Sequence, residues 1–112
     1  MTNDKRHHPR VSHHFDCRWS GQWGTTEARL EDLSATGCYI VSRMTTPSVG
    51  EIVDIELIRS TKEPLPLSGE VVQVERGVGF SLRFVELNTE TRNEIESLIA
   101  EARDSNRRVG GS

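Results

Sequence analysis

The chain has 112 residues, which is enough for one domain with a single modest hydrophobic core. Its formal net charge is −3, and an acidic chain is poorly suited to wrapping DNA or RNA, because such binding needs many cationic contacts to phosphate. No apolar run is long enough to cross a bilayer, and the first residues lack the apolar core of a signal peptide. We therefore expect a cytoplasmic protein without membrane insertion.

Residues 1–10 are predicted to form a flexible basic arm. Lys5, Arg6 and Arg10 outweigh the single acid of this segment, Asp4. The planar guanidinium of arginine presents a fork of donors that matches phosphate oxygens or the acceptor edge of guanine. Because the rest of the chain is acidic, a binding site for an anion needs a local cluster of cationic side chains. This arm provides one such cluster.

Alternating apolar and polar residues predict the first strand. From Val11 to Trp19 the odd positions are mainly apolar, which is the period of a half-buried strand, and Gly21 to Gly24 marks a hairpin turn. Turns and loops, including a long loop over 62–66, separate five further segments of strand character. These segments cover residues 25–33, 38–43, 53–57, 67–75 and 78–84. Short strands at near-regular spacing predict an all-β fold, either an antiparallel barrel or a sandwich.

The period of the apolar residues changes after position 88. Asn88 or Thr89 can cap a helix, and the apolar residues that follow recur at helical spacing. They are Ile95, Leu98, Ile99 and Ala102. The sequence therefore predicts one amphipathic helix that ends near residue 103 and covers part of the sheet or one barrel mouth. We expect residues 104–112, which are polar and glycine-rich, to be a disordered tail.

Two cysteines and two tryptophans are the other notable side chains. Cys17 and Cys38 lack CxxC spacing, so we expect small core side chains in a reducing compartment, with a disulfide between them as the alternative. Trp19 continues the apolar face of the first strand and is expected in the core. Trp23 lies in the hairpin turn, where it can anchor a protein contact or cover the end of the barrel.

The sequence predicts neither metal binding nor catalysis. The histidines at 7, 8, 13 and 14 include neighbours such as His13 and His14, whose side chains would point to opposite faces of a strand. No nucleophile motif such as GxSxG is present, and Ser34 lacks the flanking glycines of a nucleophile elbow. We therefore expect a binding module, not an enzyme, with neither a metal nor a cofactor.

Two short motifs carry the functional signal. Arg6 and Arg10 form RxxxR, and Asp32, Ser34 and Gly37 form DxSxxG about one hairpin later. Taken alone, an arginine pair near a terminus is usually solvated charge, and DxSxxG is often a turn closed by its own polar side chains. Taken together, in this order and within six predicted strands and a terminal helix, they resemble the PilZ domain family of receptors for the bacterial second messenger cyclic di-GMP.

The resemblance covers about residues 5–88, and the segment from Gly69 to Phe84 is similar to the family's final hairpin. It implies a six-stranded antiparallel β-barrel with one C-terminal α-helix, here over residues 11–103. It also implies cyclic di-GMP as the ligand, with Lys5 as a further candidate beside the motif residues. The implied ligand-binding residues are Arg6, Arg10, Asp32, Ser34 and Gly37.

The residue types of both motifs fit this ligand. Arg6 and Arg10 can each make two-point contacts with phosphate or with O6 and N7 of guanine, while Asp32 can accept from the guanine N1–H and N2–H₂ donors. Ser34 adds a hydroxyl group, and Gly37 permits a positive φ or a close backbone approach. A flexible arm that folds over the nucleotide changes conformation on binding, which makes a switch.

Two departures from the family pattern leave details open. Lys5 stands where many relatives have another arginine, so the number of nucleotides bound stays open. The fifth predicted strand, at Val71–Val74, lacks the aromatic or arginine side chain that stacks on the ligand in many relatives, although Arg76 can compensate. The expected function is a cyclic di-GMP receptor or adaptor that signals to a protein partner. The alternative is a nucleotide-independent protein-interaction adaptor with a PilZ-like barrel.

Overall fold

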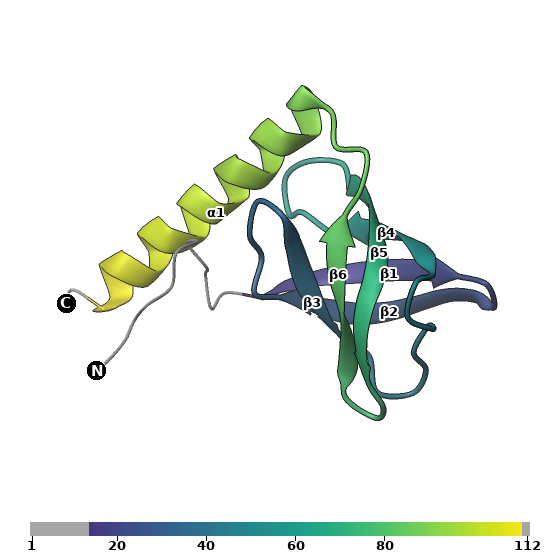
Figure 1. Cartoon of the computed structure of the whole chain (residues 1–112). Coiled ribbons are helices and arrows are strands. Elements are labelled where there is room, and N and C mark those ends of the chain that lie inside the picture. Colours follow the sequence, from purple (N-terminus) through teal and green to yellow (C-terminus); the bar gives the residue numbers. More distant parts are fainter. Residues whose placement is uncertain (1–13, 111–112) are drawn as a thin grey trace.

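The computed structural model describes residues 14–110, with side chains described as far as residue 103, so the expected arm over 1–10 lies outside the described residues. Six strands and one helix follow one another along the chain: β1 (Phe15–Gly21), β2 (Gly24–Glu31), β3 (Gly37–Val41), β4 (Ile52–Leu57), β5 (Leu65–Glu75), β6 (Gly79–Phe84) and α1 (Thr89–Gly110). The strands pair antiparallel in the order β1-β2-β3-β6-β5-β4 and close into a barrel (Figure 1). The expected six-stranded barrel with a C-terminal helix is confirmed.

Alternation along the strands fills the interior of the barrel. In β4, Val53, Ile55 and Leu57 are buried, and the residues between them are exposed. Trp19 of β1 packs edge-on against Phe80 of β6, with 5.1 Å between the ring centroids. Both rings are buried, and an edge-to-face pair stabilises a core beyond the area that it buries. Because side chains occupy the interior, a ligand has to bind to the outer surface.

The tryptophans and cysteines lie largely where the sequence predicts them. Trp19 is buried, and its indole Nε1 donates to Ser42 Oγ at 3.1 Å, while Ser42 Oγ donates to a main-chain carbonyl at 2.8 Å. Trp23, in the β1–β2 turn, is 90% exposed. Cys17 and Cys38 are buried free thiols, which confirms the expectation of small core side chains; they do not form the alternative disulfide.

The structure corrects the predicted loop over 62–66 at its last two residues. Leu65 and Pro66 already belong to β5, where they pair with Leu57 and Glu56 of β4. Proline lacks an N–H and cannot donate a hydrogen bond to a neighbouring strand. It is therefore normally confined to strand positions where the nitrogen faces no partner strand. It fits here because pairing of β5 with β6 begins only at Gly69, so this part of β5 has a neighbour on one side. Leu65 in turn contributes a buried side chain to the core.

Helix α1 begins as the sequence predicts. Asn88 Oδ1 accepts a hydrogen bond from the backbone N–H of Thr91 at 2.7 Å, which is the geometry of an N-cap. The helix lies across one end of the barrel (Figure 1), and its residues Ile95, Ile99 and Ala102 are buried in the barrel core. Across residues 14–110, no helix combines the length and apolar character that a membrane span needs.

The helix is longer than expected. It continues to Gly110, although the sequence predicts a disordered tail from residue 104. No proline follows residue 89, so the helical hydrogen bonds can continue past the last apolar residue of the stripe, Ala102. The periodicity of the apolar residues therefore predicts the part of the helix that packs on the barrel, and the helix itself ends later.

Candidate functional site

The DxSxxG motif forms the connection between β2 and β3. Asp32 ends β2 by adopting a left-handed backbone conformation with a φ of 53°, and its side chain is exposed. Leu33, the next residue, is fully buried in the core. The turn is thus anchored on the inside by Leu33 and presents the carboxylate of Asp32 on the outside, where a ligand can reach it.

Ser34 closes this turn with hydrogen bonds to its own neighbours. Its Oγ accepts from the backbone N–H groups of Thr36 and Gly37 and donates to the carbonyl of Gly37, each at 3.3 Å. The backbone N–H of Ser34 also donates to the Gly37 carbonyl at 2.9 Å. These bonds are those of a capped turn, so the hydroxyl of Ser34 acts first by fixing the loop that carries Asp32.

Gly37 is required by the packing of two strands. A Cβ on this residue would lie 2.1 Å from the carbonyl oxygen of Leu82 in β6, which no side chain can do without moving the backbone. The described glycines with a positive φ are Gly24, Gly50 and Gly77, so Gly37 is not one of them. Of the two reasons that the sequence suggests for this glycine, close backbone approach is the correct one, and the approaching group belongs to the protein.

The three described motif residues line one shallow hollow on the outer surface of the barrel. The hollow has a volume of about 290 Å³ and is closed on the other side by β6. Its lining consists of Asp32, Ser34, Thr36, Gly37, Cys38, Tyr39, Ser81, Leu82 and Arg83. Asp32 brings a negative charge to this hollow and Arg83 a positive one, so the two polarities that a guanine nucleotide presents can both be met here.

Sequence reasoning missed Arg83 and Tyr39. Arg83 directly faces Gly37 across the β3–β6 ladder and is paired with Glu70 of β5, with 2.6 Å between Nη2 and Oε1. The signal for Arg83 was its outward position in the alternation of β6, between the buried Leu82 and Phe84. The outward position of Arg83 does not by itself place this residue at the site. It does so only once β6, and not β4, the next strand in sequence, is known to pair with β3.

Tyr39 supplies an aromatic ring on the same outer face. A Cβ on Gly79 would lie 2.9 Å from Cε2 of Tyr39, so the ring extends over the glycine of the neighbouring strand. The phenol donates a hydrogen bond to Glu75 Oε1. Partial burial, together with this bond and the nearby carboxylates, raises the pKa of Tyr39 to about 12, so the phenol stays neutral well into the alkaline range. Val72 of the fifth strand, by contrast, presents only an exposed aliphatic side chain.

The motif turn also lies close to helix α1 (Figure 1). Ala35 and Thr36 face Ile99, Ala100 and Arg103 of the helix across a cavity of about 400 Å³. A ligand bound at the β2–β3 turn is therefore within reach of the helix that covers the end of the barrel.

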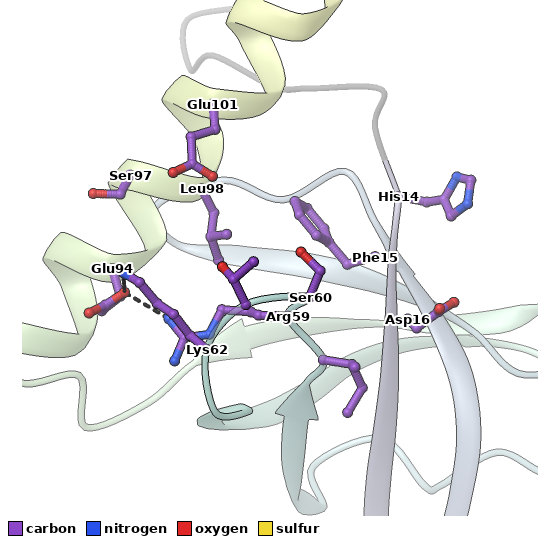
Figure 2. A pocket seen from close by; sticks show the side chains of 12 residues that line it. His14, Phe15, Asp16, Arg59, Ser60, Lys62, Glu94, Ser97, Leu98 and Glu101 are labelled. Carbon is purple, nitrogen blue, oxygen red and sulfur yellow. Dashed lines mark hydrogen bonds and ion pairs between the residues drawn. The ribbon is translucent and has the colours of Figure 1, made fainter.

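A second hollow, of about 430 Å³, lies where the chain enters β1 (Figure 2). It is bounded by His14 and Asp16, by the β4–β5 loop and by helix α1. The two cations among its described lining residues face the helix: Glu94 Oε1 lies 2.8 Å from Nη1 of Arg59 and 3.8 Å from Nζ of Lys62 (Figure 2). The pairing neutralises much of the positive charge, so this hollow favours an anion less than its composition suggests.

The remaining predicted site residues, Arg6, Arg10 and Lys5, lie outside the described residues. The structure therefore brings Asp32, Ser34 and Gly37 together, and the placement of the RxxxR motif relative to them stays a prediction.

Comparison with known proteins identifies the family. The PilZ domain family model matches residues 4–101. The chain belongs to the PilZ domain family. It is 31% identical over 80 residues to a cyclic di-GMP binding protein of Vibrio cholerae, covering 67% of this chain and 32% of that protein. The chain thus spans about a third of the length of this curated relative.

Solved structures of PilZ domains share the fold. The PilZ domain of YcgR from Escherichia coli, determined with c-di-GMP, superposes with a TM-score of 0.81 at 15% identity, covering 97% of this chain and 99% of that one. The inhibitor of motility MotI/DgrA of Bacillus subtilis gives a TM-score of 0.69 at 14% identity, covering 95% of this chain and 54% of that one. At such identities the likeness concerns the barrel and its helix, which this chain reproduces.

Proposed function

We propose that this PilZ domain binds cyclic di-GMP over its β2–β3 turn and reports the bound state to a protein partner. The observation that carries the proposal is the outward hollow in which Asp32, Ser34 and Gly37 meet. Support comes from membership of the PilZ domain family and from the relative in Vibrio cholerae, which is named as a cyclic di-GMP binding protein. We infer a cytoplasmic, non-catalytic receptor.

Each motif residue has a chemical role in this proposal. Asp32 accepts from the N1–H and N2–H₂ donors of one guanine, and Ser34 and Gly37 hold the turn that aims its carboxylate outward. Arg6 and Arg10 make two-point contacts with phosphate or with O6 and N7 of guanine, and a charged hydrogen bond of this kind stabilises a complex by about 1.5–3 kcal/mol. Lys5 adds a positive charge but lacks the planar, two-point donor geometry of a guanidinium.

Calorimetric titration of the folded chain with cyclic di-GMP tests the proposal. We expect measurable binding that weakens with added salt, because the phosphate contacts are screened. Arg10→Ala and Asp32→Ala should each weaken binding by about tenfold or more, whereas His14→Ala should do little. Absence of heat at high micromolar nucleotide, with protein that shows a cooperative unfolding transition, would reject direct sensing. Equal losses in all three variants would reject the assigned roles.

A nucleotide-independent adaptor is the second candidate, and one observation favours it. Trp23 and Met44 are 90% and 94% exposed, and tryptophan is enriched among the residues that dominate protein interfaces. If this end of the barrel binds a partner by itself, pull-down of that partner should be unchanged by nucleotide and lost in Trp23→Ala. Under the receptor proposal, added cyclic di-GMP should change the amount of partner recovered.

A further inference from the structure

Arg83 occupies a place in the barrel that the recognised motifs do not include. We infer that Arg83 is a further ligand-binding residue, whose guanidinium grips a phosphate, or the O6/N7 edge of a guanine, of the cyclic dinucleotide from the β6 side of the hollow. The inference rests on the proposed function, because it assigns a contact to the same ligand and the same site.

Strand register places Arg83 at the motif. Arg83 faces Gly37 directly across the antiparallel ladder between β3 and β6. Directly opposite residues in such a ladder have their side-chain positions about 5 Å apart on the same face of the sheet. Because Gly37 has no side chain, nothing on β3 at this position stands between Arg83 and the turn that carries Asp32. Arg83 and Asp32 accordingly line the same hollow.

Charge gives the second argument. The ligand carries two negatively charged phosphates, and Asp32 by itself would repel them. Among the described residues that line the hollow, Arg83 is the one cation that can offset this repulsion. Its side chain is 64% exposed, so an incoming nucleotide can reach it without displacing the core.

The partner of Arg83 occupies one donor of the guanidinium and leaves the others for a ligand. Glu70 Oε1 receives one hydrogen bond from Nη2 at 2.6 Å. A guanidinium has five N–H donors in a fixed fork, so one bond to a carboxylate leaves donors for a second acceptor. Glu70 faces Arg83 across the β5–β6 ladder, on the side away from Gly37. Glu70 therefore competes for one donor of Arg83, while Gly37 and its motif lie on the opposite side of this arginine.

A purely structural role for Arg83 is the alternative, and the chain provides a matched control for it. Arg18 and Glu56 also face one another across two strands, β1 and β4, with 3.1 Å between Nη2 and Oε1. This pair is exposed like Arg83–Glu70 but lies away from the hollow, because neither residue lines it. Exposed pairs of this kind contribute little to stability, so all four residues can be neutralised without unfolding the barrel.

The test is calorimetric titration of the full chain with cyclic di-GMP in wild type, Arg83→Gln, Glu70→Gln, Arg18→Gln and Glu56→Gln. We expect Arg83→Gln to weaken binding by about tenfold to a hundredfold, the range for loss of a charged hydrogen bond. Glu70→Gln should tighten binding severalfold, because it removes a carboxylate that competes with the ligand for Arg83. The two control variants should bind as the wild type does, and Arg83→Lys should fall between wild type and Arg83→Gln.

The outcomes separate this inference from the proposed function. If the wild type binds cyclic di-GMP and Arg83→Gln binds it with the same affinity, the inference is overturned and the proposed function still stands. Weaker binding in both Arg83→Gln and Glu70→Gln would show that the pair acts by holding β5 and β6 together, which also overturns it. If the wild type binds no nucleotide, the proposed function and the inference fall together. Weaker binding in Arg83→Gln and tighter binding in Glu70→Gln, with wild-type affinity in both control variants, would establish the contact.

Discussion

The carbonyl oxygen of Leu82 occupies the space that a side chain on Gly37 would need, only 2.1 Å from where its Cβ would lie. The glycine of the DxSxxG motif is therefore fixed by the contact between β3 and β6. This contact also sets the register that brings Arg83 beside the motif. A substitution at this position cannot be interpreted as a ligand contact alone, because it changes the barrel first.

Gly37→Ala should destabilise the fold strongly. Overpacking a close backbone contact costs about 3 kcal/mol or more, and the loss should appear in the urea midpoint before any ligand is added. Gly77→Asn is the matched control, because Gly77 has a φ of 77° and open space around its Cβ position, and asparagine tolerates that backbone conformation. A Gly37→Ala protein as stable as the wild type would contradict the close approach of Leu82.

The two tryptophans should respond in opposite ways to substitution and to quencher. Trp19→Phe removes the hydrogen bond to Ser42 and leaves a cavity beside Phe80, so we expect a loss of about 2 kcal/mol in the free energy of unfolding. Trp23→Phe should change it by less than about 0.5 kcal/mol. Fluorescence of the Trp23→Phe protein, which reports Trp19, should resist quenching by iodide, and strong quenching there would place Trp19 outside the core.

Arg59 should hold helix α1 against the barrel. Its side chain is only 14% exposed, and it donates to Glu94 of the helix and twice to the main-chain carbonyl of Glu63. Arg59→Gln should therefore cost about 1–2 kcal/mol and speed hydrogen exchange of the α1 amides. Arg92→Gln, on the exposed face of the same helix, should leave exchange unchanged. Equal protection in both variants would mean that apolar packing alone holds the helix.

Stability should fall in alkali because of the buried thiols. Burial raises the pKa of Cys17 from 9.0 to about 12 and raises that of Cys38 as well, so the folded chain keeps protons that the unfolded chain loses. This contribution is fully present below pH 9.0 and is lost as the pH rises towards about 12, the folded value for Cys17. Urea unfolding across this range should show the decline, and Cys17→Ala should make it shallower. An identical slope in the variant would contradict a role for Cys17.

Most of the barrel could be predicted because each strand carries its own signal. Val53, Ile55 and Leu57 alternate with polar residues, and the structure buries all three. The errors lie at boundaries where a neighbouring strand decides the outcome. Pro66 looks like a loop residue until its pairing with Glu56 is known. The helix extends beyond Ala102, which is the last core residue among the side chains that the structure describes.

The site could be predicted only in part, for a reason of topology. Asp32, Ser34 and Gly37 are close in sequence, so their motif predicts the turn directly. Arg83 lines the same hollow because β3 pairs with β6. This pairing follows from closure of the barrel, and no local sequence pattern predicts it. Tyr39 was overlooked for the same reason, because its ring extends over β6 and its hydroxyl reaches Glu75 of β5.

Because the strands close on themselves, each has a hydrogen-bonded neighbour on both sides along part of its length. A sheet with a free edge can recruit another chain by adding its strand, and domains that bind extended peptides often work in this way. A closed sheet leaves only short stretches with one neighbour, such as residues 65–68 of β5, which pair with β4 alone. Under the proposed function, we therefore expect a protein partner to recognise mainly side chains, turns or the helix of this domain, and these surface residues can change without altering the barrel.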